Sequence, residues 1–258
     1  MSSVQPIGDL LDRLRRDPGR PRVTWYDADE RVELSGHVLD NWVSKTTNLL
    51  VEELDLGPGR TAVVDLPGHW RAVVWWLAVL RTGARLSTTS AADPHPDVVI
   101  TADASSWPTA PELVVVTLPA LARRADGPLP PGAIDAAAAV MTYGDALGPV
   151  VAPPSDSPAL HPSAGGPDVS FEDLTDWAAR TADLAALAVP SPAALAPAPG
   201  PRRVLIAATG PLDGLLAACL AVLGADGSVI LCSADLAAAL AEDPARLERL
   251  RAGERVTD

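Results

Sequence analysis

The chain has 258 residues, of which 48% are hydrophobic and 21% are charged, so it is long enough to bury a substantial core. Its formal net charge is −13, and its 20 basic residues are scattered singly or in pairs, which argues against nucleic-acid or anionic-membrane binding because both need clustered Lys and Arg. The amino-terminal segment lacks a basic region followed by an apolar core, and no apolar stretch is long enough to span a bilayer, so we expect a soluble, cytoplasmic protein with no membrane partner.

The first half of the chain predicts alternating helices and strands. Residues 7–16 predict a short amphipathic helix, and residues 23–34 a hairpin around a polar turn. Ser35 is placed to N-cap a long helix whose apolar stripe runs from Leu39 to Leu54. The remaining predicted elements are strands at 61–66, 85–88, 97–101 and 113–118, and a helix at 69–81 that Gly83 ends.

The second half repeats this alternation after a stretch rich in Pro, Ser and Gly. Residues 148–167 predict a linker or irregular loop. The elements predicted beyond it are a helix at 171–188 N-capped by Ser170, an Ala/Pro-rich loop at 190–201, a strand at 203–208, a helix at 212–223 and a strand at 228–232. The chain therefore divides into a first α/β half at 1–148, a connection at 149–168 and a shorter second α/β half at 169–258. The predicted fold class is α/β, with mainly parallel sheets and flanking helices.

Few side chains form a recognisable constellation. Cys219 and Cys232 lie in apolar segments and predict two buried thiols rather than a disulfide or metal pair. The four histidines have no metal-ligand spacing, so no metal site is expected. Trp70, Trp75 and Trp76 cluster on one helix; core packing of all three is the favoured interpretation, although successive positions such as 75 and 76 cannot share a face, and the alternative is that one of them faces a groove.

Residues 23–66, VTWYDADERVELSGHVLDNWVSKTTNLLVEELDLGPGRTAVVDL, resemble the opening of the adenylate-forming, acyl-CoA synthetase-like enzymes: a hairpin, a long helix, then LGPG before an apolar strand. PGHWRAVVWWLAVLRTGARL resembles their next helix, and TGPLDGLLAACLAVLGADGSVILCS a later block. The resemblance covers about residues 20–235 and implies the N-terminal part of such an enzyme's large domain. The chain also resembles an uncharacterised actinobacterial family of short proteins similar to that part.

The resemblance places a degenerate phosphate loop within SDSPALHPSAGGPDVSFEDL. In the family this loop reads Ser-Gly-Thr-Thr-Gly-x-Pro-Lys and holds ATP phosphates. The matching positions here include Ser163, Gly165, Gly166 and Asp168; the loop is about two residues shorter, lacks both threonines and carries a carboxylate in place of the lysine. The resemblance therefore implies that ATP is not held in the family's manner, and no cofactor is expected.

The sequence also departs from the family after residue 235. The enzymes continue to an adenine-binding motif and a small domain with the adenylation lysine, whereas the only lysine here, Lys45, is predicted on a solvent-exposed helix face. These features indicate a truncated, degenerate relative without catalytic residues.

Two functional hypotheses follow from these departures. The first is a non-catalytic, pseudoenzyme-like scaffold or regulatory protein that binds a protein partner or forms a homo-oligomer. The second is a binder of an acyl, aryl or nucleotide ligand, or part of a split AMP-forming acyl-CoA ligase that another chain completes. For this second hypothesis, Pro67-Gly68, Ser163–Pro167 and Thr209–Pro211 are predicted to gather at the carboxyl ends of the strands.

Overall fold

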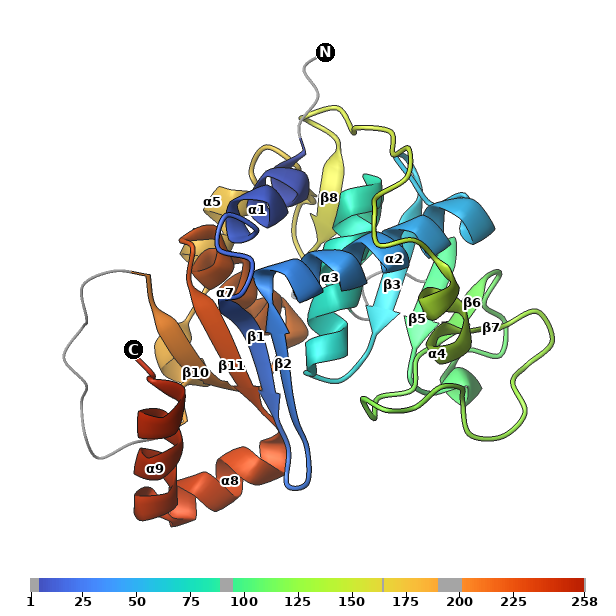
Figure 1. Cartoon of the computed structure of the whole chain (residues 1–258). Helices are drawn as coiled ribbons and strands as arrows, with labels where there is room; N and C mark the ends of the chain where they lie inside the picture. Colours follow the sequence, from blue (N-terminus) through green and yellow to red (C-terminus); the bar gives the residue numbers. More distant parts are fainter. Residues whose placement is uncertain (1–4, 89–94, 164, 190–200, 258) are drawn as a thin grey trace. The chain divides into compact units, whose positions relative to one another are not determined.

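The computed structural model of the chain (Figure 1) describes residues 5–88, 95–163, 165–189 and 201–257. These residues form two compact units that alternate along the chain. The first comprises the described residues of Met1–Asp9, Asp40–Pro67 and Arg71–Leu174, and the second those of Leu10–Leu39, Gly68–Trp70 and Thr175–Asp258. This grouping differs from the predicted division in chain order, because the predicted hairpin joins the second unit. Each unit is described by itself.

The first unit is built on a seven-stranded sheet. Its strands are β3 (Thr61–Asp65), β4 (Arg85–Ser87), β5 (Val98–Thr101), β6 (Leu113–Val115), β7 (Ile134–Asp135), β8 (Pro158–His161) and β9 (Val169–Ser170). Their spatial order is β7-β6-β5-β3-β4-β8-β9, and the neighbours are parallel apart from the antiparallel pair β8-β9. The predicted parallel strands are thereby confirmed.

Two long helices belong mainly to the first unit. The helical elements here are α2 (Gly36–Leu54), α3 (Trp70–Thr82), α4 (Ala136–Ala139), and the short 3₁₀ turns η1 (Ala104–Ser106) and η2 (Val140–Thr142). The Ser35 hydroxyl accepts a hydrogen bond from the Val38 N–H, as an N-cap does. Gly83 ends α3 with φ near 84°, and an added Cβ there would lie 3.0 Å from Pro58.

The second unit contains a four-stranded sheet in the order β10-β11-β1-β2. The strands are β1 (Pro21–Tyr26), β2 (Arg31–Ser35), β10 (Arg203–Ala207) and β11 (Ser228–Cys232). The first three in that order are parallel, and β2 closes the predicted hairpin on β1. The helices are α1 (Pro6–Leu14), which begins in the first unit, α5 (Leu174–Thr181), α6 (Leu184–Leu187), α7 (Leu212–Gly224), α8 (Ala234–Glu242) and α9 (Pro244–Glu254).

Helices α8 and α9 cover one face of this sheet. Leu205, Ile230 and Cys232 on the strands pack against Leu236 and Leu247 in one buried cluster. Cys219 on α7 and Cys232 on β11 are both buried free thiols, as predicted, and burial raises the pKa of each to about 12. Trp70, Trp75 and Trp76 are all buried, which confirms that they serve as core residues.

Two sequence predictions fail between residues 148 and 188. Residues 158–161 of the predicted linker form β8, which pairs with β4 through Leu160 and Leu86. Pro158 is compatible with a strand because it occupies the first position, where a missing N–H costs little. The predicted helix at 171–188 is instead two helices, because Asp183 caps α6 by accepting from the Ala186 N–H. The predicted loop at 190–201 lies outside the described residues except for its last position.

Among the described residues, no helix has the length and apolar character needed to cross a membrane. Within that same part of the chain, no group of three His, Cys, Asp or Glu side chains is arranged to hold a metal ion.

Candidate functional site

The segment predicted to be a degenerate phosphate loop connects β8 to β9, and β9 forms one edge of the seven-stranded sheet. Ser163, Gly165 and Gly166 lie in this connection, and Ala164 is outside the described residues. Both glycines have positive φ, at 80° and 112°, and an added Cβ on either would meet nothing within 4 Å. The glycines are therefore required by the backbone turn itself, not by a neighbour that approaches it.

Asp168, which the resemblance places at the position of the family's lysine, contacts the side chains of Arg85 and His161. Its carboxylate lies 3.1 Å from Arg85 Nη1 and 2.5 Å from His161 Nδ1. Burial alone would raise the pKa of Asp168, but the hydrogen bonds from His161 and Arg85 outweigh it and hold that pKa below its ordinary value. The loop thus carries an ionised carboxylate whose charge is paired with the Arg85 guanidinium, so the loop presents no uncompensated positive charge at this position.

Lys45 does not lie on a solvent-exposed face, so that prediction is wrong. Its side chain is 17% exposed, and its ammonium donates to the Tyr143 carbonyl at 2.6 Å and pairs with Asp145 at 2.8 Å. Asn48, one turn further along α2, accepts from the Gly148 N–H at 2.8 Å. The segment that covers Lys45 is about a hundred residues away in sequence, so helical spacing alone could not reveal it. The chain's only lysine is a structural anchor for this segment.

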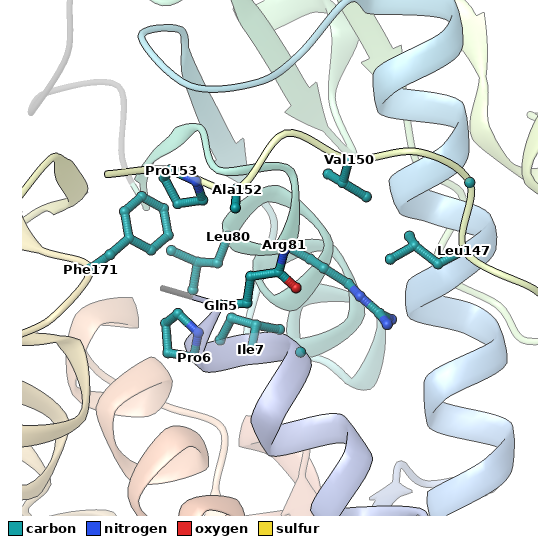
Figure 2. Close-up of a pocket in the computed structure, with 12 residues that line it drawn as sticks. Gln5, Pro6, Ile7, Leu80, Arg81, Leu147, Val150, Ala152, Pro153 and Phe171 are labelled. Atoms are coloured by element: carbon teal, nitrogen blue, oxygen red, sulfur yellow. The ribbon is translucent and has the colours of Figure 1, made fainter. Parts of the chain in front are cut away.

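A pocket of about 230 Å³ lies within the first unit. In Figure 2, Pro153 and Phe171 form one side, Leu147 and Val150 the other, and Ile7 from the start of α1 lies below. Leu80 and Ala152 occupy the centre of the view. The lining is mostly apolar, and it combines side chains from α1, α3 and the connection that precedes β8.

Arg81 supplies the charged side chain in this pocket. Its Nη1 donates to Asp40 at 3.1 Å and to Ser44 at 3.2 Å, both on α2. The Arg81 side chain is about nine-tenths buried, and its Nε has no hydrogen-bond partner among the described residues. Sequence reasoning missed this pocket. Two sequence features could have indicated it: Arg81 near the end of the otherwise apolar helix α3, and Asp40 beside the apolar stripe of α2.

The predicted gathering of loops is found in part. Within the second unit, an added Cβ on Gly68 would lie 2.7 Å from the Ala208 carbonyl oxygen, so Gly68 meets the turn that leads from β10 into Thr209–Pro211. The Ser163–Pro167 loop belongs to the first unit. Its meeting with the other two stays a prediction.

Comparison with known proteins supplies a relative of similar length. No protein-family model matches the chain. A protein from Mycobacterium tuberculosis (strain ATCC 25618 / H37Rv), the "TIGR03089 family protein", is 34% identical over 263 residues, which span 97% of this chain and 96% of that protein. The chain belongs to the TIGR03089 family.

The fold of this TIGR03089 family member is similar to part of several larger solved structures. An acyl-CoA synthetase from Brucella canis superposes with a TM-score of 0.66 at 18% identity. The superposition covers 90% of this chain and 43% of the synthetase chain. Coronafacic acid ligase from Pectobacterium brasiliense gives 0.65 at 12% identity, with coverages of 89% and 46%. The anthranilate CoA ligase AuaEII, solved with anthranoyl-AMP, gives 0.63 at 13% identity, with coverages of 89% and 45%.

The predicted resemblance to the adenylate-forming enzymes is confirmed for the fold. The chain spans less than half the length of the ligases that it matches. At these identities the superpositions establish the arrangement of helices and strands, and activity has to be argued from the residues of this chain.

Proposed function

We propose that this chain is a non-catalytic member of the acyl-CoA ligase fold that acts as a scaffold or regulatory partner of another protein. The observation that carries the proposal is the ion-paired Asp168 in the shortened loop. A single uncompensated positive charge about 5 Å from a polyphosphate stabilises it by roughly 3 kcal/mol at an effective dielectric near 20. The Asp168–Arg85 ion pair is close to neutral, so it supplies no such attraction.

Nucleotide binding tests the non-catalytic part of the proposal. We expect Mg-ATP at millimolar concentration to leave the melting temperature of the chain unchanged, and we expect no carboxylate-dependent exchange between ATP and pyrophosphate. A characterised acyl-CoA ligase run in parallel supplies the positive control. Stabilisation of the chain by several degrees that requires both magnesium and ATP would overturn the proposal.

The oligomeric state of the chain tests the proposal that it binds a partner protein or a second copy of itself. We expect the chain in extracts of its own cells to elute at a mass well above that of the purified monomer, or the purified chain to form a dimer at tens of micromolar by light scattering. A monomer in both settings would contradict the scaffold role even if ATP binding is absent.

A second candidate function is suggested by the pocket around Arg81. Its 230 Å³ lies below the roughly 300–1,000 Å³ of drug-sized ligand sites, which suits a short acyl chain or a single aromatic ring. The lining of the pocket is mostly apolar, and the Arg81 guanidinium is turned towards Asp40 and Ser44 on α2, so the pocket favours an apolar group. This arrangement supports binding of a small acyl or aryl ligand within the first unit.

Binding of small carboxylic acids, with and without a side chain that blocks the pocket, tests this second candidate function. We expect butyrate, octanoate or benzoate to raise the melting temperature, and Ala152→Phe to abolish the rise because Ala152 lines the pocket. Val151→Phe is the matched control, because Val151 is adjacent in sequence and 70% exposed. The absence of any rise, or a rise that persists in Ala152→Phe, would contradict ligand binding here.

A further inference from the structure

Four arginines line one hollow of the second unit in a chain whose net charge is −13. The hollow has a volume of about 320 Å³ and lies between the first residues of β1, β10 and β11 and the carboxyl end of α9. Its charged lining residues are Arg20, Arg31, Glu33, Arg203, Glu254 and Arg255. Four arginines face two glutamates, which leaves two positive charges in excess.

Glu254 holds two of these arginines in place. Its carboxylate accepts hydrogen bonds from Arg31 Nε at 3.0 Å, from the Tyr26 hydroxyl at 2.5 Å and from Arg203. Burial would raise the pKa of Glu254, but these three hydrogen bonds outweigh it and lower that pKa. Arg203 also donates from Nε to the Glu254 carbonyl at 2.7 Å. Arg31 and Arg203 are therefore oriented by a network that also joins α9 to the sheet.

The other two arginines are not neutralised in this way. Arg255 has a left-handed backbone, with φ of 54°, and its N–H caps α9 through the carbonyl of Ala252. Its side chain makes no ion pair or hydrogen bond with any residue that the structure describes. Arg20 has one long contact, 3.5 Å, to Asp226. Anchoring of α9 accounts for Arg31 and Arg203, but it does not account for the positions of Arg20 and Arg255 at the same hollow.

An anion with two charges matches this excess. A phosphate monoester carries about −1.5 to −2 at pH 7 and offers three acceptor oxygens, and guanidinium groups bind such oxygens in pairs. A carboxylate would compensate only one of the two charges. We propose that the arginine hollow binds the phosphate group of inorganic phosphate or of a small phosphomonoester. This site is separate from the Asp168 loop and from the pocket around Arg81, and it does not depend on the proposed function.

Titration with inorganic phosphate and with phenyl phosphate, followed by ¹H–¹⁵N NMR at constant ionic strength, tests the site. We expect saturable shifts of the Gly253 and Arg255 amides. Arg255→Gln and Arg20→Gln should each weaken binding by roughly tenfold or more, which is the loss of one charged hydrogen bond. Arg249→Gln is the matched control, because it removes the same charge from an exposed position of α9 that does not line the hollow.

The probes also separate the sources of the phosphate. Equal affinity for both probes supports a site for the phosphate group alone, and tighter binding of phenyl phosphate supports an organic phosphomonoester. Shifts that do not saturate, shifts that acetate reproduces, or equal weakening by Arg249→Gln would overturn the proposal. Unchanged melting temperatures of the variants show that any loss of binding is local.

Discussion

Asp168 has a structural role in the first unit. Its carboxylate links β4 and β8 through Arg85 and His161, which lie on neighbouring strands of the first unit. The predicted resemblance draws attention to this residue, because it places Asp168 where the family's loop has a lysine. It could not identify the partners, since Arg85 lies 83 positions away and its proximity depends on the pairing of the two strands.

We expect Asp168→Asn to lower the free energy of unfolding by about 1 kcal/mol at pH 7, the upper range for partly exposed pairs. Because the pKa of Asp168 is lowered in the folded state, its contribution is present above the unfolded value, about 3.9, and is lost as the pH falls through the folded value. Urea denaturation at pH 7 and pH 3 should therefore show a difference from the parent that shrinks on acidification. Asp126→Asn, at an exposed position of the same unit, is the control; an equal loss there, or a difference independent of pH, would contradict this role.

Arg22 is a residue whose burial the sequence did not reveal. It is fully buried in β1, and its guanidinium donates to the carbonyls of Asp226 at 2.7 Å and Leu14 at 3.2 Å. We expect Arg22→Met to cost about 3 kcal/mol of unfolding free energy, because it leaves these acceptors unpaired. Chemical denaturation measures the loss, and Arg202→Met, at an exposed position, should change it by less than about 0.5 kcal/mol. Equal effects of the two variants would show that the buried contacts contribute little.

At the scale of elements, the turn between α7 and β11 depends on close backbone approach. An added Cβ on Gly227 would lie 2.7 Å from the Val222 carbonyl oxygen and 2.8 Å from that of Arg202. Gly224, three residues earlier at the end of α7, has open space around the same position. The two glycines therefore form a matched pair in a single connection.

We expect Gly227→Ala to destabilise the chain by about 2 kcal/mol through steric overlap, and Gly224→Ala to be neutral or to stabilise it by about 0.5 kcal/mol through the higher helix propensity of alanine. Thermal unfolding of the two variants measures the difference. Similar melting temperatures would mean that the turn relaxes without cost.

The elements that sequence patterns predict well are those with long apolar runs. The strands at 61–66 and 228–232 and the helices at 69–81 and 212–223 were predicted within about two residues of their observed ends, because uninterrupted apolar segments need burial on several sides. β8 was missed because Pro and Ser surround its short apolar core and its partner β4 is distant in sequence. The pocket around Arg81 was missed for the same reason, since its lining comes from four separate stretches of the chain.

At the scale of the whole molecule, chain order and compact units do not coincide. Residues 10–39 and 175–258 contribute to one unit although most of the other unit lies between them in sequence. The parallel pairing of β1 with β11 joins positions separated by about two hundred residues. A composition shift at residues 148–167 marks a change along the chain, but strand pairing, which composition does not encode, determines which segments fold together.

The two cysteines provide a test of this grouping, because both lie in the second unit. Burial raises each thiol pKa to about 12, so at pH 8 little thiolate is present in the folded chain, and we expect almost no reaction with a thiol reagent until the unit opens. Arg22→Met lies in the same unit and should accelerate labelling by roughly a hundredfold, the equivalent of about 3 kcal/mol in the opening equilibrium. Comparison of the labelling rates of this variant and the parent at several urea concentrations measures that change. Rapid labelling of the native parent, or no acceleration in Arg22→Met, would show that the cysteines are not enclosed by the core that Arg22 supports.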